Sequence, residues 1–162
     1  MTAISNLKFK QPIWQTAIIL TLGFWLSASL FLDWVIMPSL YLSGMMSQAG
    51  FTTAGYTIFW NFNRVELLSA AVVLTGVLAL SKTQYHWHLE GIVLSVLLLT
   101  IAMLDTYFLT PQMCAIGVQL NFFEAAAIPS TMNLLHGSYL VLEVVKVVVG
   151  STLLSWCWRE QI

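Results

Sequence analysis

Four polar residues in the last apolar stretch of the sequence have a spacing that suits chemistry. They stand at i, i+3, i+7 and i+10, and they are His136, Tyr139, Glu143 and Lys146. Residues at this spacing lie on one stripe of an α-helix, and every residue between them is Leu, Val, Gly or Ser. A stripe that carries an imidazole, a phenol, a carboxylate and an ammonium could bind a cation or exchange protons.

Further polar residues interrupt the three other apolar stretches. They are Asp33 in the first stretch, Asn61, Asn63, Arg64 and Glu66 in the second, and Asp105 in the third. Counting along each stretch at about 1.5 Å per residue places these groups at a similar depth, in the outward-facing half of a membrane. An ionisable side chain inside a membrane costs a few kcal/mol, so each one needs a partner or a function.

The expected cluster holds more acidic than basic groups. Four carboxylates oppose the cations of Arg64 and Lys146, and the excess of two negative charges could be balanced by a bound cation or by protons. Glu143 and Lys146, at i and i+3, are expected to pair, with Lys146 near the membrane midplane. We predict a ligand-binding cluster made of His136, Glu143, Lys146, Glu66, Asn63, Arg64, Asp105, Asp33 and Tyr139.

The same residues also fit a purely structural role. Arg64 could extend to the membrane surface, and Asp33 and Asp105 could lie in contact with water. Glu143 and Lys146 could form a pair that fixes helix packing. The residues by themselves leave both interpretations open.

The residue types do not identify a cofactor. The sequence contains no Glu-x-x-His motif, so a di-iron site of the ferritin kind has little support. His86 and His88 are expected on the opposite membrane side from His136, which argues against a bis-histidine haem. A metal ion stays compatible with the residue types, and so does a haem held by His136 alone. No nucleophile–base motif or phosphate-binding loop occurs, so the case for an enzyme is weak.

Four helices must position these groups. The chain has 162 residues, of which 59% are hydrophobic and 8% charged, and its mean hydropathy is +0.83. Soluble domains carry roughly 25% charged residues, so a soluble protein is excluded, and the near-neutral charge excludes a nucleic-acid partner. Apolar stretches at about 14–41, 56–80, 89–109 and 132–158 are each long enough to span a bilayer. We predict one all-α domain, an integral membrane four-helix bundle over residues 1–162.

The positions of the basic residues predict the orientation of this bundle. Lys8, Lys10, Lys82 and Arg159 flank the stretches on one side, and segments 42–55 and 110–131 contain no Lys or Arg. Cationic flanks favour the cytoplasmic side, so we expect both termini inside and the first stretch retained as an anchor. Asn121 and Glu124 have the spacing of a capping box, which predicts a short outer helix there.

Several short motifs resemble a known family of small four-span membrane proteins, typified by the transmembrane protein 205-like domain. The motifs are Phe24-Trp25, Val35-Ile36-Met37-Pro38-Ser39-Leu40-Tyr41, Ala49-Gly50, Thr110-Pro111-Gln112-Met113 and Leu135-His136. The resemblance implies a compact four-helix membrane bundle and carries over Pro38, Pro111 and His136 only. Glu143 and Lys146 are not expected from that family. A weaker resemblance to membrane protoporphyrinogen oxidases lacks the histidine of that family's first helix.

The function predicted from these observations is the binding or translocation of a small cation, or of a proton-coupled solute, at an outward-facing polar cluster. One alternative is a non-catalytic subunit or assembly factor of a larger membrane complex. Another is a membrane redox enzyme that uses haem or quinone. The expected partners are the lipid bilayer and, under the first alternative, other membrane subunits.

Overall fold

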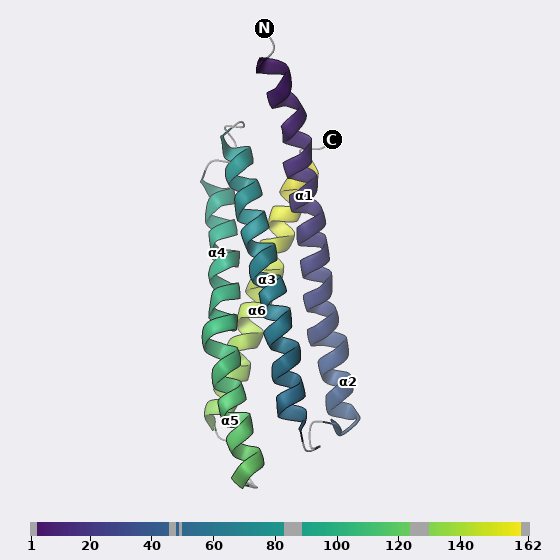
Figure 1. Cartoon of the computed structure of the whole chain (residues 1–162), viewed down its shortest axis with the longest axis vertical. Helices are drawn as coiled ribbons and strands as arrows, with labels where there is room; N and C mark the ends of the chain where they lie inside the picture. The colour runs from purple at the N-terminus through teal and green to yellow at the C-terminus, as the bar shows by residue number, and fades with distance from the viewer. Residues whose placement is uncertain (1–2, 46–47, 49, 83–88, 124–129, 160–162) are drawn as a thin grey trace.

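A computed structural model describes residues 3–45, 48, 50–82, 89–123 and 130–159, and within these ranges it describes no side chain in 3–12, 52 or 118–123. The described chain is helical and contains four long rods (Figure 1). The helical elements in order are α1 (Ala3–Phe31), the π-helical turn η1 (Leu32–Ile36), α2 (Met37–Leu42), α3 (Phe51–Ser81), α4 (Glu90–Leu104), the π-helical turn η4 (Asp105–Leu109), α5 (Thr110–Phe123) and α6 (Ser130–Arg159).

The four rods are α1–η1–α2, α3, α4–η4–α5 and α6, in chain order. Each rod is long and apolar enough to cross a membrane. The candidate spans are Ile13–Leu42, Thr53–Ser81, Glu90–Gly117 and Ser130–Arg159, of 28 to 30 residues each, whereas a bilayer requires about 20. The predicted all-α four-helix membrane bundle is therefore confirmed.

Two predicted boundaries need correction. The third rod does not end near residue 109, because η4 leads directly into α5 and the helix continues to Phe123. Asn121 therefore lies inside α5. The capping-box pattern had predicted that a new helix begins there. Residue 124, the other half of that motif, lies outside the described residues. The capping-box pattern covers only four residues, so it is weak evidence that a new helix begins.

The four rods form a closed ring of contacts. The α1 helix packs against α3 and α6, and α4 packs against the same two helices. Successive rods run in opposite directions, and both chain ends lie at the same end of the bundle (Figure 1). We call this the terminal end of the bundle.

Glycine allows close approach at two of these contacts. A Cβ atom at Gly76 of α3 would lie 2.6 Å from Cγ1 of Ile18 in α1, and one at Gly150 of α6 would lie 2.9 Å from Cδ2 of Leu26. Membrane helices associate through such small residues, because lipid provides no hydrophobic driving force between helices.

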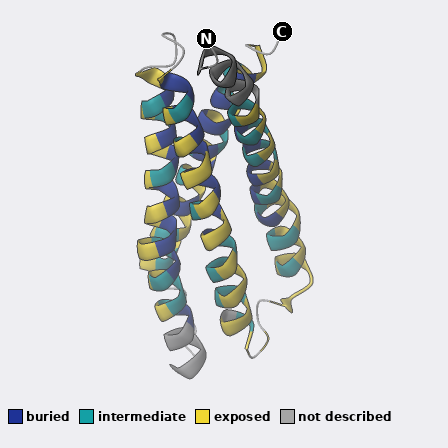
Figure 2. Cartoon of the chain, turned by 45° about the horizontal axis from the view of Figure 1, so that its top comes forward, coloured by how far each residue is buried: buried dark blue, intermediate teal, exposed yellow. Residues whose placement is uncertain are grey.

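Buried residues face the inside of the ring, and exposed residues lie on its outer surface (Figure 2). Large hydrophobic side chains are exposed on all four rods, for example Leu20, Leu68, Val93 and Leu140. The apolar core occupies the terminal half of the bundle and includes Ile18, Leu22, Trp25, Ala70, Val73, Val77, Leu80, Leu98, Ala102, Val149, Leu153 and Cys157. The polar residues lie next to this core, on the side away from the chain ends.

Candidate functional site

Glu66 and Lys146 occupy the centre of a buried polar cluster. The Lys146 ammonium donates hydrogen bonds to Oε1 of Glu66, at 2.5 Å, and to Oε1 of Glu143. Lys146 is 0% exposed, Glu66 1% and Glu143 5%. The predicted pairing of Glu143 with Lys146 is confirmed, and Glu66 is a second partner on a different helix.

Two side chains of α1 hold the Glu66 carboxylate in place. Trp25 donates its indole N–H to Oε1 of Glu66 at 2.9 Å, and the Ser29 hydroxyl donates to the same atom at 3.0 Å. The Lys146 Nζ atom also lies 5.9 Å from the centre of the Trp25 ring. Donors from α1 and α6 thus converge on one oxygen of α3, which is the pattern expected for a charged carboxylate.

Asp105 is the exception in this cluster, because no described residue donates a hydrogen bond to its carboxylate. The residue is 0% exposed, and among the described residues neither of its carboxylate oxygens has a hydrogen-bond partner. One carboxylate oxygen from each of Glu66, Asp105 and Glu143 lies within 4.8 Å of the others. A buried carboxylate without a partner is costly, so this group requires a proton or a cation.

Asp33 and Tyr139 extend the cluster toward the end opposite the chain termini. The Tyr139 hydroxyl donates to Oδ1 of Asp33 at 2.9 Å, while Oδ2 of Asp33 is buried without a partner among the described residues. Asp33 lies within electrostatic range of Lys146 and Glu66. The Tyr139 ring also packs edge-on against Phe59, with 6.1 Å between ring centres. Because Asp33 is only half-buried, it is the most accessible carboxyl of the group.

We use "carboxylate cluster" for Asp33, Glu66, Asp105 and Glu143 together with Lys146. Both aspartates of the cluster lie on π-helical turns, Asp33 on η1 and Asp105 on η4. A π-turn inserts an extra residue into a helix and often occurs at functional sites. It changes the direction in which the following side chains point, and it interrupts the α-helical hydrogen-bond ladder.

A proline follows each π-turn and accounts for it. Pro38 and Pro111 both stand two residues after the last residue of the turn. Proline has no N–H, and its ring collides with the carbonyl four residues earlier; those carbonyls belong to Trp34 and Tyr107, inside the two turns. The sequence therefore contains a signal for these π-turns that the prediction did not use. Each aspartate stands five or six residues before a proline.

Asn63 supports the second π-turn from α3. Its side-chain amide donates to the Thr110 hydroxyl at 2.8 Å and to the Asp105 backbone carbonyl at 3.4 Å. Asn63 is 2% exposed, so the amide is available only to these neighbours. Asn63 thus contacts the backbone beside the cluster rather than its carboxylates. Trp25, Ser29 and Thr110 are contacts that the prediction missed, because no charge marks them in the sequence.

Two predicted site residues lie apart from the cluster. Arg64 is exposed, and its guanidinium lies over the Trp60 ring, 4.5 Å from the ring centre. His136 is exposed, and its Nδ1 lies 3.0 Å from the backbone oxygen of Met132 in the same helix. Within the described residues, neither has an ion pair or hydrogen bond to the cluster. The charge count therefore changes from two cations to one, with Lys146 facing four carboxyl groups.

The cluster lies near the middle of the rods. Glu66 is 15 residues from each end of α3, about 22 Å of helix on either side, and Lys146 is close to the middle of α6. The prediction placed Glu66 and Asp105 toward the outer ends of stretches 56–80 and 89–109, whereas α3 begins at Phe51 and the third rod continues to Phe123. That Lys146 lies near the membrane midplane stays a prediction, which its position midway along α6 suits.

Comparisons with known proteins identify no relative. No protein-family model matches the sequence, no curated protein matches it, and no solved structure matches the fold. The resemblance to transmembrane protein 205-like domains therefore stays a prediction. What defines this protein is its class, a multi-pass membrane bundle with buried carboxylates around a lysine.

Proposed function

We propose that this protein binds and releases a small cation inside the membrane, and that the cation is a proton. The observation that carries the proposal is Asp105, which is fully buried and, among the described residues, has no donor for either carboxylate oxygen. If all four carboxyls of the cluster were ionised, Lys146 would leave three negative charges uncompensated. Burial of that much charge is prohibitive, so protons or another cation must be held there.

The position of Lys146 favours protons over a metal ion. A metal shared by Glu66, Asp105 and Glu143 would bind the same two glutamate carboxylates that the Lys146 ammonium already engages. A second positive charge at that place would be repelled strongly in a medium of low dielectric constant. A proton on Asp105 instead neutralises the carboxyl without displacing Lys146.

The surroundings of the carboxylate cluster favour proton exchange with the end of the bundle opposite the chain termini. Toward the terminal end, the apolar core begins with Trp25, Ala70 and Ala102. Toward the other end, Tyr139 and the half-buried Asp33 follow. A proton would therefore enter through Asp33 and reach Glu143, Lys146 and Asp105, and transport across the membrane would require the apolar side to open.

The three carboxylate oxygens within 4.8 Å of one another support a metal ion as the second candidate. Hard cations such as Ca²⁺ and Mg²⁺ bind carboxylate oxygens. This candidate requires the Lys146 ammonium to move away from Glu66 and Glu143, or to lose its proton, when the metal binds.

Infrared spectroscopy of the purified protein during a pH titration tests the proposal. The proton candidate predicts a C=O stretching band of a buried protonated carboxyl that disappears in Asp105→Asn and persists in the control Glu90→Gln, at the exposed start of α4. In parallel, thermal unfolding with added Ca²⁺, Mg²⁺, Mn²⁺ or Zn²⁺ tests the metal. A metal that binds the folded state raises its stability by RT ln(1 + [L]/Kd), and this gain should vanish in Asp105→Asn.

The two readouts separate the candidates. An Asp105-dependent infrared band without stabilisation by any added metal supports the proton. Thermal stabilisation by an added metal that is lost in Asp105→Asn supports the metal. If neither signal depends on Asp105, the cluster is a packing network and the proposal is wrong.

A further inference from the structure

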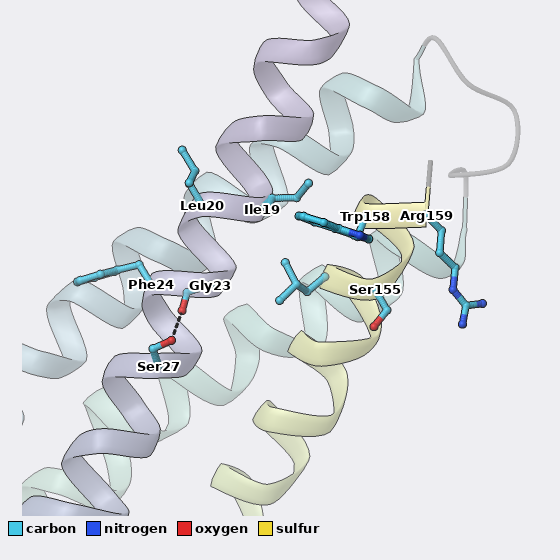
Figure 3. A pocket seen from close by; sticks show the side chains of 9 residues that line it. Ile19, Leu20, Gly23, Phe24, Ser27, Ser155, Trp158 and Arg159 are labelled. Atoms are coloured by element: carbon cyan, nitrogen blue, oxygen red, sulfur yellow. Dashed lines mark hydrogen bonds between the residues drawn. The ribbon is translucent and has the colours of Figure 1, made fainter. Parts of the chain in front are cut away.

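A groove between α1 and α6 lies at the terminal end of the bundle, away from the carboxylate cluster. Its volume is about 820 Å³, which is within the range of small-ligand sites. Gly23 and Ser27 line it from α1, and Ser155, Trp158 and Arg159 line it from α6 (Figure 3). The groove opens on the outer surface that a bilayer would cover.

The groove exists because one wall lacks a side chain. A Cβ atom at Gly23 would meet nothing within 4 Å, so the space next to this part of α1 is empty. The Ser27 hydroxyl donates to the Gly23 carbonyl at 2.7 Å, so this hydroxyl is already hydrogen-bonded within α1. The remaining walls are largely apolar, with Leu20 and Phe24 at the margin. Such a surface suits a hydrocarbon chain.

One end of the groove carries a basic residue, Arg159. Arg159 is exposed at the last turn of α6, and within the described residues it has no ion pair. Figure 3 shows Trp158 extending from α6 toward Ile19 and the Arg159 guanidinium directed away from the bundle. Tryptophan and arginine at the end of a membrane helix are typical of the lipid headgroup region.

We infer that this groove is a binding site for an anionic phospholipid, with the phosphate group at Arg159 and one acyl chain along the α1–α6 wall. The charge complementarity of Arg159 with a phosphate selects an anionic headgroup. The predicted orientation agrees, because it places this end at the cytoplasmic leaflet, where anionic lipids are enriched. The ligand is thus a membrane lipid, and the site does not depend on the proposed function of the carboxylate cluster.

Native mass spectrometry of the detergent-purified protein, titrated with phosphatidylglycerol or with phosphatidylcholine, tests this inference. We expect tighter binding of phosphatidylglycerol to the unmodified protein. Arg159→Gln should weaken phosphatidylglycerol binding roughly five-fold, the equivalent of about 1 kcal/mol for one basic residue at an anionic surface. It should leave phosphatidylcholine binding nearly unchanged.

Two further variants make the test specific. Gly23→Leu should fill the groove and reduce the binding of both lipids, without a change in the unfolding temperature measured in lipid-free detergent. Lys82→Gln removes one positive charge from the end of α3 and serves as the control, which should bind phosphatidylglycerol like the unmodified protein. Equal binding of the two lipids by the unmodified protein would overturn the inference. So would an unchanged affinity in Gly23→Leu, or an equal loss in Lys82→Gln and Arg159→Gln.

Discussion

Replacement of Lys146 by methionine tests the electrostatics of the carboxylate cluster directly. Methionine keeps most of the volume of the side chain and removes its charge. The Oε1 atoms of Glu66 and Glu143 both bind the Lys146 ammonium, so in Lys146→Met they face each other without a cation between them. We expect this to be the most destabilising single substitution in the cluster.

The structure allows an estimate of the size of the effect. Removal of one partner from a buried ion pair costs about 3–5 kcal/mol, because the other charge is left uncompensated. For a chain of this length, 1 kcal/mol corresponds to about 2–4 °C in unfolding temperature, so a loss of roughly 6–20 °C is expected. Glu143→Gln alone should cost less, about 1.5–3 kcal/mol for one hydrogen bond to a charged group, because Glu66 still neutralises Lys146.

The double variant Glu143→Gln with Lys146→Met should be more stable than Lys146→Met alone. In the double variant, the remaining Glu66 carboxylate still accepts hydrogen bonds from Trp25 and Ser29. Thermal unfolding in detergent, followed by circular dichroism, measures all three variants. The cost of Lys146→Met should also shrink as the pH falls, because the folded variant binds protons that the unfolded chain does not and is therefore stabilised by acid.

Two results would refute this reasoning. One is a double variant that is less stable than Lys146→Met, which would mean that Glu143 contributes mainly through packing. The other is a destabilisation by Lys146→Met that does not change with pH, since a packing defect has no reason to depend on protons. Either result would remove the charge argument on which the proposed function depends.

Three further predictions follow from the contacts described above. Trp25→Phe removes the indole N–H and should cost about 0.6–1.7 kcal/mol, the range of interhelical hydrogen bonds in membranes, measured by thermal unfolding in detergent. Gly76→Val should lower stability by about 1–3 kcal/mol through overpacking of the α1–α3 contact, whereas Gly55→Ala, where an added Cβ meets its nearest atom at 3.9 Å, should not. In a cysteine-free background, an impermeant thiol reagent added to intact cells should label Ser43→Cys and not Lys82→Cys, and the reverse pattern would contradict the predicted orientation.

Much of the fold could be predicted from the sequence because membrane insertion is a local property. Each span depends on the apolar residues of one stretch, and no knowledge of the partner helices is needed. The Glu143–Lys146 pair was predictable for the same reason, since i and i+3 are neighbours in any α-helix. Arg64 could have been placed outside the cluster as well. It is two residues from Glu66, about 200° around the helix, so the two side chains cannot share a face.

The phase of a helix and the choice of partners across the bundle were not predictable from any one stretch. The π-turns at Asp33 and Asp105 change the direction of the side chains in the first and third rods, so the regular 3.6-residue count fails there. His136 lies on the stripe of Glu143 by that count, yet it is exposed, because the ring of contacts around α6 does not cover this end of the stripe.

The sequence by itself determined that this chain is a four-span membrane protein and that charged groups are buried in it, because hydropathy and charge are properties of individual residues. Only the tertiary structure decided which groups meet. It placed Glu66 against Lys146, 80 residues away in the chain, and it left Asp105 buried with no donor in the described part of the chain. The physical reason is that the energy of a buried charge depends on the distance to its neighbours, and helices that are far apart in sequence set that distance.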